Sequence, residues 1–92
     1  QRVIREKILL AIYNEFLKGN NDMRNIIQPE TLDVATADFC KEIQHLQSEG
    51  LIYGAVLIRH RDDVFPYRVI LRNVVMTFYG LAYVKQHLLA QI

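Results

Sequence analysis

The sequence predicts an α+β fold that is mainly α, in which helices accompany one small β hairpin. Apolar residues recur at helical spacing near the start, the middle and the end of the chain. Residues 51–61 and 67–75 are rich in β-branched and aromatic residues and flank a turn-forming segment. The length of 92 residues and the hydrophobic content of 51% suit one core, so a single domain is expected over residues 1–92.

The first predicted helix covers residues 3–17. Ile8, Ile12 and Phe16 form a row with four-residue spacing. A second apolar row lies beside it: Leu9, Tyr13 and Leu17. Together the rows cover more of the helix surface than a helix facing one core needs. We therefore expect this helix either to be central in the core or to present surplus apolar surface to a partner.

A short helix and a longer one are predicted in the middle of the chain. In residues 28–33, Pro29 lies in the first turn of the short helix, where its missing amide is tolerated. Thr36 is a candidate N-cap for the longer helix, residues 37–49. Gly50 supplies the end of that helix, because glycine readily adopts the positive φ of a helix C-cap.

The hairpin and the last helix complete the predicted fold. Pro66 lacks an amide donor, so it is expected in the hairpin loop or at the start of the return strand. An early strand near residues 26–27 would add a third strand. Thr77 is expected to cap the last helix, in which Leu81 and Val84 belong to the clearest apolar row.

This order of elements is that of a winged helix-turn-helix with a two- or three-stranded β wing and a C-terminal helix. The core is expected to draw on every helix and on the first strand: Ile8, Ile12, Phe16, Leu32, Phe39, Ile43, Leu46, Ile52, Leu81 and Val84. In such a fold the third helix normally enters the major groove of DNA, so its outward residues bear directly on function.

Two motifs carry a family resemblance. One is the glutamate-glycine-aliphatic end of the third helix, at residues 49–51. The other is the opening of the last helix, where Thr77, Gly80 and Tyr83 follow one another at three-residue spacing. In these motifs the chain resembles the YjcQ-like family of small winged-helix proteins from bacteria and their phages, over about residues 34–88. The resemblance implies a winged helix-turn-helix of DNA-binding ancestry and implies no catalytic residues.

One position departs from the family pattern. Relatives commonly have a lysine immediately before the last glycine, where this chain has Tyr79. If that lysine contacts phosphate in relatives, this chain has lost the contact. The remaining candidates for DNA contact are the third helix and the hairpin, to which Arg2 and Arg5 would add unless they are simply a solvated helix terminus.

The third helix offers few groups for base recognition. Its outward positions are expected to be Asp38, Lys41, Glu42, His45, Ser48 and Glu49. Acids outnumber the lysine in this set, which is unfavourable beside phosphates. Lys41, Gln44 and Gln47 would be nearest the groove, and glutamine can read an adenine edge. The alternative is that this face is simply solvated.

The hairpin is more basic than the third helix. Arg59 and Arg61 are two residues apart and are expected to project from one strand face, with Arg68 on the return strand. These arginines are candidate phosphate contacts, which would give a modest, strongly salt-dependent and largely sequence-independent affinity. Alternatively, their charges protect the hairpin edge from pairing with another strand.

No motif indicates catalysis, a metal site or a cofactor. The histidines share no ligand spacing with Cys40, and no glycine-rich phosphate loop occurs. Cys40 itself is expected to be a small buried residue. No segment suits a membrane span or a leader, and no small-molecule substrate is evident. A cytoplasmic protein that is not an enzyme and needs no cofactor is therefore expected.

The leading hypothesis is a DNA-binding protein, a small transcriptional regulator whose target the sequence does not specify. The net charge of only +1 means that its affinity for double-stranded DNA would depend on a local basic patch. The rival hypothesis is a protein-interaction or dimerisation module that uses the same fold without DNA. A homodimer through the first and last helices would set two hairpins at a fixed spacing.

Overall fold

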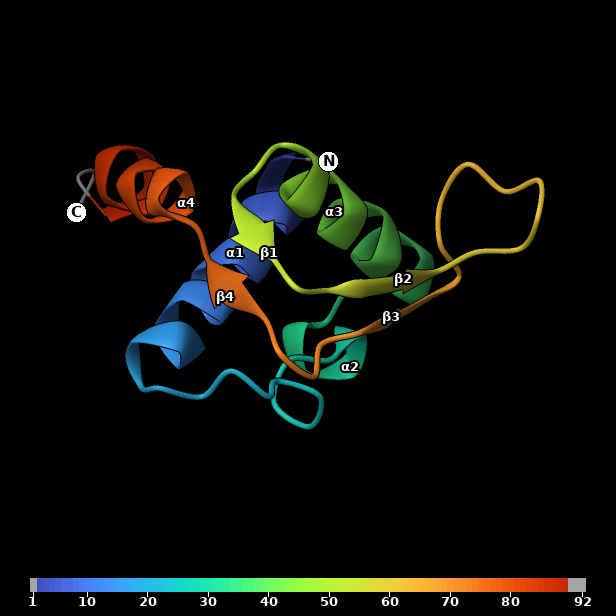
Figure 1. The fold of residues 1–92 in the computed structure, drawn as a ribbon, viewed down its shortest axis with the longest axis horizontal. Helices are drawn as coiled ribbons and strands as arrows, with labels where there is room; N and C mark the ends of the chain where they lie inside the picture. Colours follow the sequence, from blue (N-terminus) through green and yellow to red (C-terminus); the bar gives the residue numbers. More distant parts are fainter. Residues whose placement is uncertain (1, 90–92) are drawn as a thin grey trace.

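The computed structural model describes residues 2–89 (Figure 1). The helices are α1 (Arg2–Leu17), α2 (Pro29–Leu32), α3 (Thr36–Ser48) and α4 (Phe78–Tyr83), which continues as the π-helical segment η1 (Val84–Leu89). The strands are β1 (Ile52–Tyr53), β2 (Val56–Ile58), β3 (Arg68–Ile70) and β4 (Val75–Met76). Strand β1 pairs with β4 and β2 pairs with β3, both antiparallel. The arrangement is winged-helix-like and confirms the predicted α+β, mainly α, class.

Helix α1 passes behind β1 and β4 in Figure 1. It packs against α3, β4 and η1. Both predicted apolar rows supply buried residues: Ile8, Leu9, Ile12 and Tyr13. The width of the apolar surface on α1 is therefore explained by contacts within the chain, as the first of the two alternatives predicted.

The predicted hairpin exists, but it is not continuous. The pairs on either side of the interruption are Tyr53 with Val75 and Val56 with Ile70. Residues 54–55 therefore stand opposite the longer segment 71–74, which must bulge. The bulge turns Leu71 and Val74 into the core. The expected unbroken strands 51–61 and 67–75 are wrong in this respect, because burying those side chains requires a break in the ladder.

Gly54 lies at the interruption and permits a close backbone approach. Its φ is +100°, in the region that favours glycine. A Cβ at this position would overlap the carbonyl oxygen of Asn73. The outgoing and return segments can therefore pass closely only because position 54 has no side chain.

An additional extended segment lies beside the bulge. The Met23 amide donates to the Leu71 carbonyl at 2.8 Å, and the Val74 amide donates to the Asn21 carbonyl at 3.0 Å. The early strand predicted near residues 26–27 is wrong, since those residues form a turn and a bend. The segment that does pair with the return segment, residues 21–23, was not predicted. The polar residues before Met23 show neither the two-residue period nor the high β-propensity of a strand.

The two ends of α3 differ in how they are stabilised. The helix begins at Thr36 itself and has no side-chain cap hydrogen bond, so the predicted capping role of Thr36 is wrong. At the other end, the amides of Gly50 and Leu51 donate to the carbonyls of Gln47 and Leu46 at 3.1 and 3.0 Å. This pattern is a Schellman motif, and it confirms that Gly50 ends the helix.

Thr77 joins the start of α4 to the end of α3. Its Oγ1 accepts from the Gly80 amide at 2.8 Å, which confirms the predicted cap. The same hydroxyl donates to the Gly50 carbonyl at 2.6 Å. Gly80 lies so close to the Leu51 carbonyl that a Cβ there would overlap its oxygen. The two motifs of the family resemblance therefore meet in space.

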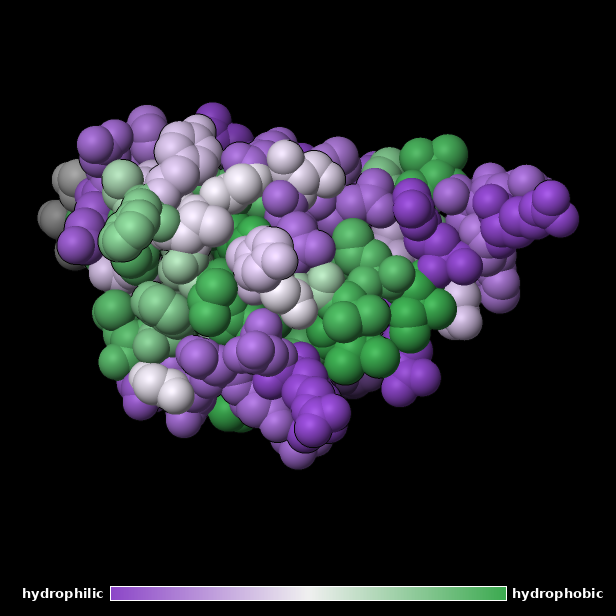
Figure 2. All heavy atoms as spheres, viewed as in Figure 1, coloured by the Kyte–Doolittle hydropathy of each residue, from purple (hydrophilic) through white to green (hydrophobic). Residues whose placement is uncertain are grey.

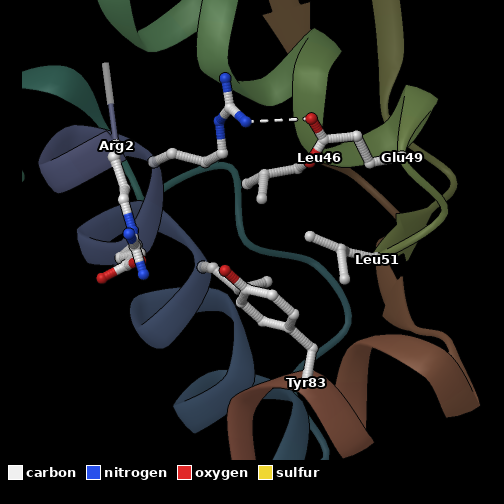
Figure 3. Close-up of a pocket in the computed structure, with 8 residues that line it drawn as sticks. Arg2, Leu46, Glu49, Leu51 and Tyr83 are labelled. Carbon is white, nitrogen blue, oxygen red and sulfur yellow. Dashed lines mark hydrogen bonds and ion pairs between the residues drawn. The ribbon is translucent and has the colours of Figure 1, made fainter. Parts of the chain in front are cut away.

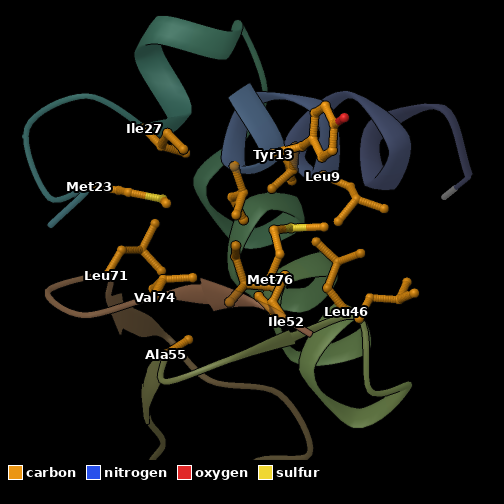
Figure 4. Close-up of a cluster of buried hydrophobic side chains, with 14 of the residues drawn as sticks. Leu9, Tyr13, Met23, Ile27, Leu46, Ile52, Ala55, Leu71, Val74 and Met76 are labelled. Carbon is orange, nitrogen blue, oxygen red and sulfur yellow. The ribbon is translucent and has the colours of Figure 1, made fainter. Parts of the chain in front are cut away.

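The core lies between α1, α3 and the strands (Figure 4). Of the predicted core residues, those fully buried are Ile8, Ile12, Phe39, Ile43, Leu46, Ile52 and Val84. Those only partly buried are Phe16, Leu32 and Leu81. Figure 4 shows Met23, Ile27, Leu71 and Val74 at one end of the cluster, which the sequence pattern did not predict. Met23, Leu71 and Val74 come from the irregular segments that pair at the bulge, and Ile27 comes from the bend that follows Met23.

Candidate nucleic-acid interface

The wing, defined here as β2, the loop 59–67 and β3, projects from one end of the domain (Figure 1). Arg59, Arg61 and Arg68 are all exposed on it. Strand β2 ends at Ile58, so Arg59 and Arg61 belong to the loop and not to a strand. Arg59 and Arg61 therefore do not share a strand face, contrary to the prediction, although both remain at the outer end of the wing.

The wing arginines have no acidic partner in the described part of the chain, in contrast to four other cations of the chain that form ion pairs. The ion pairs elsewhere are Arg2 with Glu6, Arg5 with Glu42 and Glu49, Lys18 with Glu15, and Arg24 with Asp22. Within residues 2–89, Arg59, Arg61 and Arg68 take part in no ion pair or side-chain hydrogen bond. Asp62 and Asp63 share the loop and offset part of its charge.

The wing loop is held by contacts of its own. The rings of His60 and Tyr67 stack with centroids 4.2 Å apart and planes 11° apart. The Asp63 amide donates to the His60 carbonyl at 3.1 Å, and Pro66 is buried. Figure 2 shows hydrophilic spheres gathered at the outer end of the wing. The loop therefore presents its charged residues from a folded turn.

The same loop folds back onto α3. Phe65 lies 5.8 Å from His45, ring centroid to ring centroid, and the Lys41 Nζ lies 5.0 Å from the Phe65 centroid. The Gln44 Nε2 reaches the Val64 carbonyl at 3.5 Å. Lys41, Gln44 and His45 are half-buried as a result. The outward face of α3 is thus partly covered by its own wing.

Gln47 holds the start of the wing. Its Nε2 donates to the Ala55 carbonyl and its Oε1 accepts from the Ala55 amide, both at 2.9 Å. This pair of bonds satisfies both backbone groups of Ala55 at the interruption of the hairpin. Of the third-helix residues proposed from sequence, Gln47 therefore binds the residue immediately before the wing, Gln44 binds the wing loop, and Lys41 lies over Phe65 of that loop.

Glu42 is buried, although the sequence pattern placed it on the outward face of α3. Its side chain is only 1% exposed, and the Arg5 Nε donates to its Oε1 at 2.7 Å. Burial alone would raise the pKa of Glu42, but hydrogen bonds from cationic groups, Arg5 among them, leave that pKa below its ordinary value. The expectation of an exposed Glu42 is wrong because α1 crosses this part of α3.

Arg5 also lines a pocket between α1, α3 and α4 (Figure 3). The pocket has a volume of about 200 Å³, and Figure 3 shows Leu46, Leu51 and Tyr83 around it. The Arg5 Nη1 donates to Glu49 at 2.9 Å, and the nearby Arg2 is paired with Glu6. Since both arginines already have carboxylate partners, neither of them is free to bind an anionic ligand in this pocket.

A second surface is apolar and aromatic. Phe78 is 93% exposed at the start of α4, and Tyr79 and Tyr53 are also largely exposed. Val56 adds to the exposed apolar surface on β2, and Figure 2 shows hydrophobic spheres over the β2–β3 pair. Tyr79, the position that departs from the expected family pattern, therefore lies on the surface and contributes to this aromatic patch.

Other classes of site find little support in the described part of the chain. Among residues 2–89, no cluster of histidine, cysteine or acidic side chains could hold a metal ion. Cys40 is buried, and this burial raises the pKa of its thiol. None of the helices in this range combines the length and apolar character that crossing a bilayer requires.

Comparison with known proteins gives one family. Residues 7–88 match the family model described as YjcQ protein. No curated protein and no solved structure gives a significant match. The matched range includes most of α1, so it extends well beyond residues 34–88, where the two motifs lie.

Proposed function

The chain belongs to the YjcQ family, and on that premise we propose that it is a small DNA-binding regulator whose wing holds double-stranded DNA. The observation that carries the proposal is the set of exposed wing arginines without acidic partners, Arg59, Arg61 and Arg68. Arginine forms strong charge-assisted hydrogen bonds with phosphate. The proposed role is binding and regulation, and no catalytic step is assigned to the domain.

The proposal gives the wing the main part and α3 a supporting part. Lys41, Gln44 and Gln47 would have to give up contacts with Phe65, Val64 and Ala55 to reach base edges. Phosphate contacts position a protein on DNA without reading its sequence. Binding through the wing is therefore expected to be modest and largely independent of sequence.

Removing the wing arginines is expected to abolish most of the DNA affinity. If each arginine neutralises one phosphate, log K should fall with log salt at a slope of about −2.7, or roughly 40-fold between about 50 and 200 mM salt. The triple variant Arg59→Ala, Arg61→Ala, Arg68→Ala should bind weakly at low salt with a slope near zero. Fluorescence anisotropy with a labelled random duplex measures both quantities.

A matched control carries the same change of net charge outside the wing. Lys7, Lys18 and Lys85 are all exposed, and their triple alanine variant should keep most of the salt slope. In the opposite direction, replacing Asp62 and Asp63 with asparagine should tighten binding, because it removes the acids of the loop. Equal losses in the two triple variants would show that net charge, and not the wing, supports binding.

A second candidate function is protein interaction, favoured by the exposed Phe78, Tyr79 and Tyr53. The predicted homodimer used the apolar arcs of the first and last helices. Because most of the apolar surface of α1 is covered within the chain, apart from Val3 and Leu17 at its two ends, the start of α4 is the main part of that interface that remains exposed. On this alternative a second copy covers the aromatic surface, with or without DNA.

Sedimentation across a concentration series tests this second candidate. The wild-type protein should self-associate, and a Phe78→Ser, Tyr79→Ser variant should remain monomeric because the aromatic area is lost. A Val3→Ser, Leu17→Ser variant is the control, since both residues are exposed apolar positions on α1. A wild-type protein that stays monomeric throughout the series would contradict the dimer.

A further inference from the structure

A groove separates β3 from α2 and the turn before it. Its first part is lined by Arg24, Ile27, Gln28 and residues 68–71. Its second part extends past Glu30, Thr36 and Tyr67, and each part has a volume of about 210 Å³. The two parts share Pro29, Phe39, Arg68 and Val69, so they form one continuous groove. Figure 1 shows α2 on this side of β3.

The groove follows the backbone edge of β3. Successive side chains of a strand point to opposite faces, so a groove that touches all of residues 68–71 must run along the edge of the strand. Leu71 accepts the Met23 amide on this edge. Alternate residues of a strand direct their backbone groups to the same side. Val69 therefore directs its N–H and C=O toward the same edge as Leu71, the edge that faces the groove. Within residues 2–89, β3 pairs only with β2, on its other edge.

The chain already places one extended segment on this edge. Residues 21–23 lie opposite the return segment, with Asn21 bonded to Val74 and Met23 to Leu71. This order is antiparallel, and the chain then turns away at residues 24–26. The edge beside Val69 is therefore the uncovered continuation of a strand position that the fold itself uses.

The faces of β3 define which side chains an added strand would need. Val69 packs toward the core, beside Phe39 and Pro29 in the groove, so the inward side chain of the added strand must be apolar. Arg68 lies on the opposite face of β3 and has no acidic partner within residues 2–89. Arg24 is already paired with Asp22 at 2.7 Å. The charge left for a ligand in the groove is therefore that of Arg68.

We propose that this groove binds an extended acidic segment of a partner protein, which adds to β3 as a further strand. An apolar side chain of the segment faces Phe39 and Val69, and the acidic side chains on either side of it face outward beside Arg68. Glu30 on the far rim repels acids there, so the acidic position lies at Arg68 and not at α2. The proposal uses the inner edge of the wing and does not depend on DNA binding, although Arg68 belongs both to the groove and to the proposed DNA surface.

The test uses a blocked octapeptide of alternating aspartate and valine with the whole labelled protein. Amide resonances should shift along β3, and exchange of the Val69 amide should slow. A peptide with N-methylated valines cannot donate along the edge and should bind at least about tenfold more weakly, the value of one or two hydrogen bonds. The Arg68→Glu variant should bind the aspartate peptide roughly three- to tenfold more weakly than the wild type does, and should prefer a lysine-valine peptide.

Arg61→Glu is the matched control, because it makes the same charge reversal in the loop, outside the groove. It should leave peptide affinity unchanged within about twofold. Shifts confined to the loop, absence of binding, or equal binding of aspartate and lysine peptides would each overturn the proposal. Concentration-dependent protection of Val69 without peptide would also overturn it, by showing that a second copy occupies the edge.

Discussion

Replacing Gly80 with alanine is expected to destabilise the protein severely, although alanine is the better helix former. A Cβ at position 80 would overlap the carbonyl oxygen of Leu51, which is backbone and cannot rotate away. The first turn of α4 would have to move off the Schellman motif and break the Thr77 hydrogen bonds. We expect the free energy of unfolding to fall by about 3 kcal/mol or more, and the melting temperature to fall by more than about 10 °C.

Gly19→Ala provides the control for this prediction. Gly19 has φ +84°, but no neighbouring atom lies within 4 Å of the place that a Cβ would occupy, so alanine there adds only backbone strain of roughly 1 kcal/mol. Thermal unfolding followed by circular dichroism compares the two variants. If Gly80→Ala proved as stable as Gly19→Ala, the close contact between α4 and Leu51 would not exist in solution.

Removing Arg5 is expected to have the second large effect on stability. The Arg5→Leu variant keeps much of the side-chain volume but takes a cationic hydrogen-bond donor from Glu42, which is 1% exposed. Loss of one partner from a buried ion pair is strongly destabilising. Because Arg5 itself is partly exposed, we expect a moderate decrease of about 2 kcal/mol in the free energy of unfolding at neutral pH. Urea unfolding measures the change in midpoint. Arg2→Leu should leave it unchanged, since Arg2 forms only a surface pair with Glu6.

The effect of Arg5→Leu should depend on pH with a definite sign. The folded-state pKa of Glu42 is lowered, so its contribution to stability is present above the unfolded pKa and is lost as pH falls through the folded pKa. The difference between wild type and variant should be constant above about pH 5 and shrink below about pH 4. A difference that grew on acidification would show that the ion pair does not stabilise the fold.

The regular elements were easier to predict from the sequence than the irregular ones. Rows with helical period identified α1 and α3 because burial along a helix repeats every turn, and Gly50 and Thr77 marked ends whose chemistry is local. Residues 21–23 and 71–74 have no such period, since each is ordered by the other across the domain. The buried Met23, Leu71 and Val74 therefore could not be predicted from neighbours in sequence.

The candidate site was also predicted only in part, because some of its features depend on local sequence and others on contacts between distant elements. The exposure of Arg59, Arg61 and Arg68 follows from charge in a turn-rich hairpin. The roles of Gln44, Gln47 and Glu42 do not follow from helical periodicity, because their partners are Val64, Ala55 and Arg5 on other elements. Nor does any local pattern reveal that the β3 edge stays open, since that depends on where residues 24–26 turn away.

Short-range patterns in the chain were sufficient for the α+β class, the end of α3, the start of α4, the basic wing and the family motifs, because all of these rest on residues close in sequence. Long-range packing was needed to show that a Cβ at position 80 would overlap the Leu51 carbonyl, that Glu42 is buried, that Phe65 partly covers α3, and that one edge of β3 is unpaired in the part of the chain that the structure describes. Each of these depends on a contact across many residues, where packing and hydrogen bonding override the local preference of a helix face or a strand.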